Sequence, residues 1–209
     1  MPRSARIVVS GCPHHVTQRG NRREPVFFQP GDYQVYLAVL GSQCRKHGVE
    51  VWAYCLMPNH VHLVLCPRDE GGLSRALSET HRRYSAFINS RNGWSGHLFQ
   101  ARFASVVMDE RHLLAASRYV ALNPVRAGLV THANEWRWSS VHAHLAGKSD
   151  GVVMVEPLLA RIACFADTLE VPVDEPQEFT ALRVAETSGH PLGDEAFVAS
   201  LRERAKGTG

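Results

Sequence analysis

The sequence contains no long hydrophobic run, no closely paired cysteines and few lysines. No apolar stretch approaches the ~20 residues that span a bilayer, and the first residues carry no signal-peptide core, which predicts a cytoplasmic protein without a membrane partner. The five cysteines are odd in number and form no Cys-x-x-Cys pair, so we expect reduced thiols and neither a disulfide framework nor a zinc site. The remaining composition, 44% hydrophobic and 21% charged, is typical of a globular protein.

The charge is distributed unevenly along the chain. Residues 1–148 hold 18 of the 23 basic and 9 of the 20 acidic residues, a balance of +9, whereas residues 149–209 have a balance of −6. A basic body favours a polyanionic partner, most often nucleic acid, although the excess of arginine over lysine would also follow from a GC-rich genome. Because the hydrophobic pattern weakens after Gly147, we place a domain boundary near residue 148, between residues 1–148 and an extension over 149–209 that contacts DNA, shields the basic groove or merely packs.

The order of the expected elements indicates an α+β fold. Strands are predicted from β-branched and aromatic residues at 7–20, 49–57, 60–66 and 97–107. Helices are predicted from the spacing of apolar residues at 32–47, 73–91 and 109–122. Asp32 and Asp109 are the expected N-caps of the first and third helices, and Pro124 is expected to interfere with continuation of the third. We therefore expect an antiparallel sheet covered by helices mainly on one face, followed by a mostly helical extension.

The strongest local motif is His60-Val61-His62 within a predicted strand. Side chains alternate along a strand, so His60, His62 and Val64 share one face and Val61 shares the other. Two imidazoles on one rigid face are suited to binding one divalent ion. The alternative is that both histidines are structural or solvent-facing, as histidines commonly are, and the triplet by itself does not decide between the two.

A second candidate group lies in the third predicted helix. Tyr119 and Asn123 are four residues apart, so they share a helical face. A tyrosine hydroxyl beside a metal-polarised phosphate is able to attack it and form a phosphotyrosine. The competing interpretations are that Tyr119 is a half-buried aromatic residue and that Asn123, which precedes Pro124, is a cap or turn residue. Tyr84 is the rival nucleophile, because two arginines precede it.

Five motifs, together with their order along the chain, carry a resemblance to a known family. They are MPNHVHLV at 57–64, YVALNPVRAGLV at 119–130, HVTQRGN at 15–21, WRWSS at 136–140 and PLGDEAFV at 191–198. Together they resemble the REP-associated tyrosine transposases, which belong to the His-hydrophobic-His (HUH) single-strand DNA transposases with one catalytic tyrosine. The resemblance covers about residues 5–148 well and the tail in patches.

This resemblance implies a ferredoxin-like domain that nicks and rejoins single-stranded DNA beside a hairpin. Tyr119 would form a 5′-phosphotyrosine link, and His60 and His62 would hold Mg²⁺ or Mn²⁺. Asn123 stands where relatives place a third metal ligand, often glutamine. Such a protein would be cytoplasmic and nucleoid-associated, as a monomer or a homodimer. The alternatives are a hairpin-binding protein with a regulatory or genome-organising role and little cleavage, and a metal-dependent hydrolase that uses water.

Arginines and aromatic residues are the candidates for contacting DNA. The expected phosphate contacts are Arg19, Arg22, Arg23, Arg82, Arg83, Arg102 and Arg126. The expected stacking residues for unpaired bases are Trp94, Phe99, Trp136 and Trp138. For each of these residues the competing interpretation is an ordinary structural role, since most aromatic residues pack in the core and most arginines are simply solvated.

Overall fold

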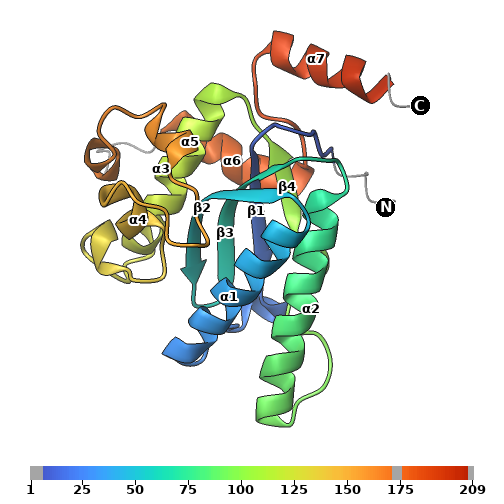
Figure 1. The fold of residues 1–209 in the computed structure, drawn as a ribbon, viewed down its shortest axis with the longest axis vertical. Helices are drawn as coiled ribbons and strands as arrows, with labels where there is room; N and C mark the ends of the chain where they lie inside the picture. Colours follow the sequence, from blue (N-terminus) through green and yellow to red (C-terminus); the bar gives the residue numbers. More distant parts are fainter. Residues whose placement is uncertain (1–6, 171–175, 207–209) are drawn as a thin grey trace.

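A computed structural model of the protein describes residues 7–170 and 176–206 (Figure 1). Its centre is a four-stranded sheet with the order β2-β3-β1-β4, in which every neighbouring pair is antiparallel. The strands are β1 (His14–Arg19), β2 (Val49–Met57), β3 (His60–Pro67) and β4 (Ala104–Val107). The chain order strand–helix–strand–strand–helix–strand, with the first strand at the centre, is the ferredoxin-like arrangement, so the expected fold class is confirmed.

Three long helices pack on the sheet, and shorter ones follow later in the chain. The long helices are α1 (Pro30–Lys46), α2 (Gly72–Asn92) and α3 (Glu110–Arg126). The later helices are α4 (Val141–Leu145), α5 (Glu156–Leu159), α6 (Gln177–Ser188) and α7 (Glu195–Lys206). Single turns of 3₁₀-helix form at Asn21–Arg23, Ala133–Glu135 and Ala166–Leu169. No helix of the described ranges is long and apolar enough to span a membrane.

The two faces of the sheet bury different side chains. Val61, Leu63 and Leu65 of β3 pack with α1 and α2 in one core, as the alternation predicts. Val64 of β3 packs with α3 and with Phe179 of α6 in a second core. The pair α1 and α2 therefore covers one face, as expected, and α3 with α6 covers the other (Figure 1). We expected helices mainly on one face and did not anticipate the second helical layer. The histidine side chains point to the face of the sheet that this second layer covers.

Of the two predicted N-caps, one is confirmed and one is wrong. Asp109 caps α3 through the backbone N–H of His112, which confirms the prediction. Asp32, in contrast, is not the N-cap of α1, because the helix begins two residues earlier. Its carboxylate accepts hydrogen bonds from the N–H groups of Phe28 and Gln29 and pairs with Arg91 of α2. In the sequence, a buried acidic residue within the first turn of a helix that accepts hydrogen bonds from backbone N–H groups looks the same as an N-cap residue.

Two element boundaries were also predicted wrongly. The helix α3 does not end at Pro124 but continues through it to Arg126. A proline in the last turn removes only one intrahelical donor, so the helix tolerates it there. The strand predicted at 97–107 shrinks to Ala104–Val107, since Ala101 has a φ of 45° and interrupts the extended backbone. Before that point, only an isolated bridge joins Phe99 to Gly20.

The tail packs onto both cores. Val153 and Val155 join the α1–α2 core, while Phe179 and Leu182 join the core beneath α3. Leu201 of α7 contacts a small cluster at the end of the sheet. The helical nature of the extension is thus confirmed, and the boundary near residue 148 stays a prediction. All five cysteines are free thiols, three of them buried, as the sequence predicted.

Candidate active site

The site begins with the pairing of β1 and β3. Thr17 lies opposite His62 and Arg19 lies opposite His60 in the antiparallel register. Val16 points into the α1–α2 core, so its neighbour His15 points to the opposite face of the sheet. That is the face on which the two motif histidines lie. The sheet register therefore brings three imidazoles from two strands onto the face that α3 covers.

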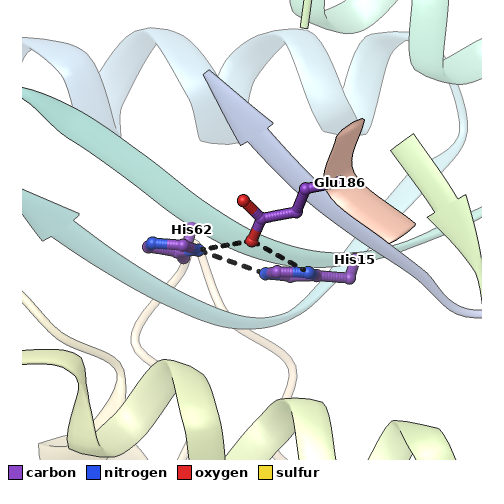
Figure 2. A group of neighbouring side chains, drawn as sticks. All are labelled: His15, His62 and Glu186. Carbon is purple, nitrogen blue, oxygen red and sulfur yellow. Dashed lines mark hydrogen bonds and ion pairs between the residues drawn. The ribbon is translucent and has the colours of Figure 1, made fainter. Parts of the chain in front are cut away.

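A glutamate from the tail completes this histidine cluster, which consists of His15, His62 and Glu186 (Figure 2). His15 Nε2 lies 3.2 Å from His62 Nδ1. The Oε1 atom of Glu186, on α6, lies 3.8 Å from His15 Nδ1 and 3.9 Å from His62 Nδ1. The three potential ligand atoms lie within 4.8 Å of one another, a spacing compatible with a bound ion.

Tyr119 packs edge-on against the cluster from α3. Its ring centroid lies 5.5 Å from that of His62 and 6.0 Å from that of His15. His60 is the next ring, 4.8 Å from His62. The guanidinium of Arg126 lies 4.7 Å from the Tyr119 ring centroid, and Phe179 of α6 contacts the same ring at 5.2 Å. The predicted nucleophile and both predicted histidines therefore meet in one place, with Tyr119 only 6% exposed.

Asn123 follows Tyr119 by one helical turn and is also buried. Its side-chain Nδ2 has no hydrogen-bond partner among the described residues. An unpaired amide at a buried position costs about 1–3 kcal/mol, so it is expected to have a partner in the functional state. Because Nδ2 is a donor, the missing partner is an acceptor such as a phosphate oxygen, whereas a metal ion would be bound through Oδ1.

Burial controls the protonation of the cluster. Desolvation lowers the pKa of His15 to about 4, and desolvation together with the charge of Arg19 lowers that of His60 to about 4. Burial, reinforced by the neighbouring histidines, also lowers the pKa of His62. All three imidazoles are thus neutral near pH 7 and retain lone pairs for a metal ion. Burial raises the pKa of Glu186 to about 7.

The hydroxyl of Tyr119 is held in its protonated form. Burial and then the negative charge of Glu186 raise its pKa, while a hydrogen bond from Arg126 opposes the rise. Without a neighbouring positive charge, a buried tyrosine with a raised pKa forms the phenolate less readily than an exposed tyrosine, so it is a weaker nucleophile. Arg126 is the group in contact that favours the phenolate.

The predicted DNA-contacting arginines fall into two groups. Arg19 and Arg126 lie at the cluster, as described above. Arg22 and Arg23 are exposed on the 3₁₀ turn that follows β1, and both have left-handed backbone, with φ of 54° and 64°. Arg102 is exposed on the loop before β4.

Arg82 and Arg83 are placed elsewhere. They lie on α2, which packs on the opposite face of the sheet from His62, and both pair with Glu79. The structure therefore does not bring them to the candidate active site, whatever their role in contacting DNA at a distance.

The predicted stacking residues are mostly part of the core. Phe99 and Trp138 are buried, and Trp136 is partly buried with its indole N–H bonded to Leu56 O. Trp94 alone among the four is well exposed, at 51%, and it contacts exposed Phe28. Large aromatic residues are abundant both in protein cores and in surfaces that stack on nucleic-acid bases, so composition could not separate the two roles.

The rival nucleophile is excluded by its position. Tyr84 is fully buried in the α1–α2 core, and its hydroxyl donates to Val26 O at 2.6 Å. Tyr33, Tyr36 and Tyr54 lie in the same core. All five tyrosines fall within the described ranges, and Tyr119 is the one whose ring contacts His15 and His62.

Sequence reasoning missed two members of the cluster. His15 lies in the HVTQRGN motif, and strand alternation places it on the same face as Thr17. The register of this strand with β3 was not predictable from local sequence. Glu186 carries no sequence signal, because it resembles any acidic residue of an amphipathic helix. Its place follows from the packing of Phe179 and Leu182 on the second core.

Comparisons with known proteins find relatives of this chain. Residues 8–123 match the family described as "Transposase IS200 like". A Haemophilus influenzae protein provisionally named a REP-associated tyrosine transposase is 25% identical over 112 residues, which cover 47% of this chain and 62% of that protein. The REP-associated tyrosine transposase of Escherichia coli is 23% identical over 115 residues, 54% of this chain and 67% of its own.

A solved structure shares the fold. It is a REP-associated tyrosine transposase bound to a REP hairpin, and it matches 74% of this chain and 90% of its own with a TM-score of 0.60 and 21% identity. The chain therefore spans less than two thirds of the Haemophilus relative's length and most of the solved one. These matches confirm the resemblance drawn from the sequence motifs.

Proposed function

Because this chain belongs to the IS200-like transposase family, which its residues 8–123 match, we propose that it nicks and rejoins single-stranded DNA beside a hairpin. The relative whose structure is solved is bound to a REP hairpin, which supports a hairpin of that class as the substrate. The observation that carries the proposal is the contact of the Tyr119 ring with His62, next to His60. A nucleophile and two neutral imidazoles within one buried cluster form the minimum machinery for this chemistry.

The donor set fits Mg²⁺ or Mn²⁺, the ions that the family implies. His60 donates its Nδ1–H to Asn59 Oδ1 at 2.6 Å, which leaves Nε2 with a lone pair. His60 and His62 would hold the ion, with Asn123 as the third ligand through its Oδ1 atom. When bound, the ion would act as a Lewis acid on the scissile phosphate.

The chain's own residues account for the transfer step. The Tyr119 hydroxyl oxygen attacks phosphorus, a Tyr–O–P bond forms, and the bond from phosphorus to the 3′ oxygen breaks. The phenol proton leaves, and the departing oxygen takes up a proton to become a 3′-hydroxyl. Arg126 favours the phenolate by its positive charge. The phosphotyrosine ester conserves the energy of the broken phosphodiester bond, so rejoining needs only the reverse attack by a 3′-hydroxyl and no added energy source.

One observation favours a second candidate, a protein that binds hairpins and rarely cuts them. Tyr119 is only 6% exposed, and Phe179 of α6 packs on its ring. We infer that DNA would reach the hydroxyl more readily if α6 moved aside. A protein that seldom made this movement would act by binding alone.

The decisive experiment is capture of a covalent adduct. Wild-type protein is incubated with labelled single-stranded DNA that carries a hairpin, with Mn²⁺, and the products are separated under denaturing conditions. We expect an adduct that Tyr119→Phe abolishes, because the substitution removes only the hydroxyl. Hairpin binding should persist, and excess chelator should also remove the adduct.

Tyr84→Phe is the matched control, since it removes a hydroxyl from the other core. It should retain the adduct. Peptide mapping that finds DNA on Tyr84, or an adduct that survives in Tyr119→Phe, would contradict the assignment. Tight hairpin binding with no adduct from wild type would favour the second candidate.

A further inference from the structure

His15 is a buried imidazole beside His62, and the proposed chemistry gives it no role. It is 1% exposed, and its Nε2 lies 3.2 Å from His62 Nδ1. The two rings are nearly parallel, at 5°, and Figure 2 shows them edge-on and side by side. Imidazole N–H groups and lone pairs lie in the ring plane, so this arrangement is that of an N–H···N hydrogen bond. The open question is which nitrogen carries the proton.

Glu186 determines the direction of this bond. Its Oε1 lies 3.8 Å from His15 Nδ1, and neither atom has a hydrogen-bond partner among the described residues. When Glu186 is ionised, as at the pH 8 of the test below, a lone pair on His15 Nδ1 would face the lone pairs of the carboxylate, which is repulsive, whereas an N–H there is attracted to it. The proton of His15 therefore belongs on Nδ1, and its Nε2 must accept from His62 Nδ1–H.

We propose that His15, oriented by Glu186, is a positioning residue that fixes His62 in the tautomer with the proton on Nδ1. His62 Nε2 then carries the lone pair that a metal ion requires. The inference rests on the proposed function, because it assumes that His62 binds the ion. Asn59 acts in the same way on His60, so each histidine of the motif has its Nδ1–H engaged and its Nε2 available.

A competing arrangement would make His15 and Glu186 direct ligands together with His62. The spacing of the three groups permits it. Against it, the Nε2 of His15 is already engaged by His62, and the arrangement would leave His60 outside the site. The two arrangements give opposite results when His15 and His60 are substituted in turn.

The first test reads the tautomer directly in the full chain. Protein with ¹⁵N-labelled histidine, free of metal, is examined by long-range ¹H–¹⁵N NMR spectroscopy near pH 8. We expect His62 to carry its proton on Nδ1 and His15 to carry its own on Nδ1. A proton on Nε2 of His62 would overturn the inference, and no variant is needed for this reading.

The second test measures Mn²⁺ affinity without DNA, by electron paramagnetic resonance of the free ion. His15→Phe keeps a ring of similar size but removes the acceptor, so we expect Mn²⁺ binding to weaken about 10–100-fold. His14→Gln is the matched control: this neighbouring buried histidine bonds Cys12 O and the Val9 N–H, outside the cluster, and its substitution should leave the affinity unchanged. Unchanged affinity in His15→Phe would overturn the inference.

Two further outcomes separate the possibilities. If His15→Phe abolishes Mn²⁺ binding while His60→Ala retains it, His15 is a ligand and the positioning role is wrong. If wild type forms no DNA adduct but the tautomer and the Mn²⁺ results hold, the proposed function fails and the inference stands. Should His15→Phe not fold, Glu186→Leu removes the group that orients His15, and the Nδ1–H population of His62 is expected to fall.

Discussion

His14 should make the protein sensitive to acid. It is fully buried at the start of β1, where its Nδ1–H donates to Cys12 O at 2.8 Å and its Nε2 accepts from the Val9 N–H at 3.2 Å. A second proton on Nε2 would face the Val9 N–H, and desolvation opposes the charge. Burial accordingly lowers the pKa of His14 to about 4, although its backbone hydrogen bonds oppose the shift.

The sign of the effect follows from proton linkage. The folded pKa is depressed below the unfolded value of 6.5, so between pH 6.5 and pH 4 the unfolded chain binds a proton that the folded chain refuses. The free energy of unfolding therefore falls as the pH falls through this window, by about 1.4 kcal/mol per pH unit. From pH 7 to pH 5 the contribution of His14 amounts to a loss of about 2 kcal/mol.

The assay is urea unfolding at pH 7 and at pH 5, for wild type and for His14→Gln. The glutamine amide offers a donor and an acceptor but does not titrate. Other buried histidines also lower the stability in acid, so the informative quantity is the difference between the two proteins. Wild type should lose about 2 kcal/mol more than the variant over this interval. Equal losses would refute the reasoning.

Two predictions concern stability away from the cluster. Asp32→Asn should lower the free energy of unfolding by about 2–4 kcal/mol in urea, because it weakens the pair between this buried carboxylate and Arg91, whereas Asp69→Asn, in an exposed pair, should cost clearly less; equal costs would contradict this account. Gly20→Ala should cost about 1–3 kcal/mol, since a Cβ there would collide with the Glu24 carbonyl and the Val26 side chain. At Gly31 a Cβ would meet open space, so Gly31→Ala should be neutral or stabilising in the same urea unfolding assay.

The parts of the fold that the sequence predicts are those with local causes. The β2–β3 hairpin follows from two strands joined by two residues, and alternation then places His60 and His62 on one face. The start of α3 follows from Asp109, whose side chain bonds within its own turn. Each of these features is set by residues a few positions apart.

The remainder depends on long-range packing. Periodicity alone did not place Tyr119 beside the histidines, and the family resemblance was needed to connect them. Phe99 and Trp138 were candidates for stacking on DNA, yet they fill the core, because the sequence does not state which aromatic faces another element covers. Glu186 reaches the cluster only through the docking of α6, which no local pattern records.

The chain order of these elements has a consequence for synthesis on the ribosome. Tyr119 follows His62 by 57 positions, so at ~5–20 residues per second it is translated roughly 3–11 s later. During that interval the β2–β3 hairpin can form with its two histidines in place, since its strands are adjacent in the chain. In the proposed mechanism Tyr119 is the nucleophile, so a nascent chain that ends before α3 would lack the group that joins to DNA. Strand breakage by this route would begin only in chains in which translation has passed α3 and that helix has closed the second face of the sheet.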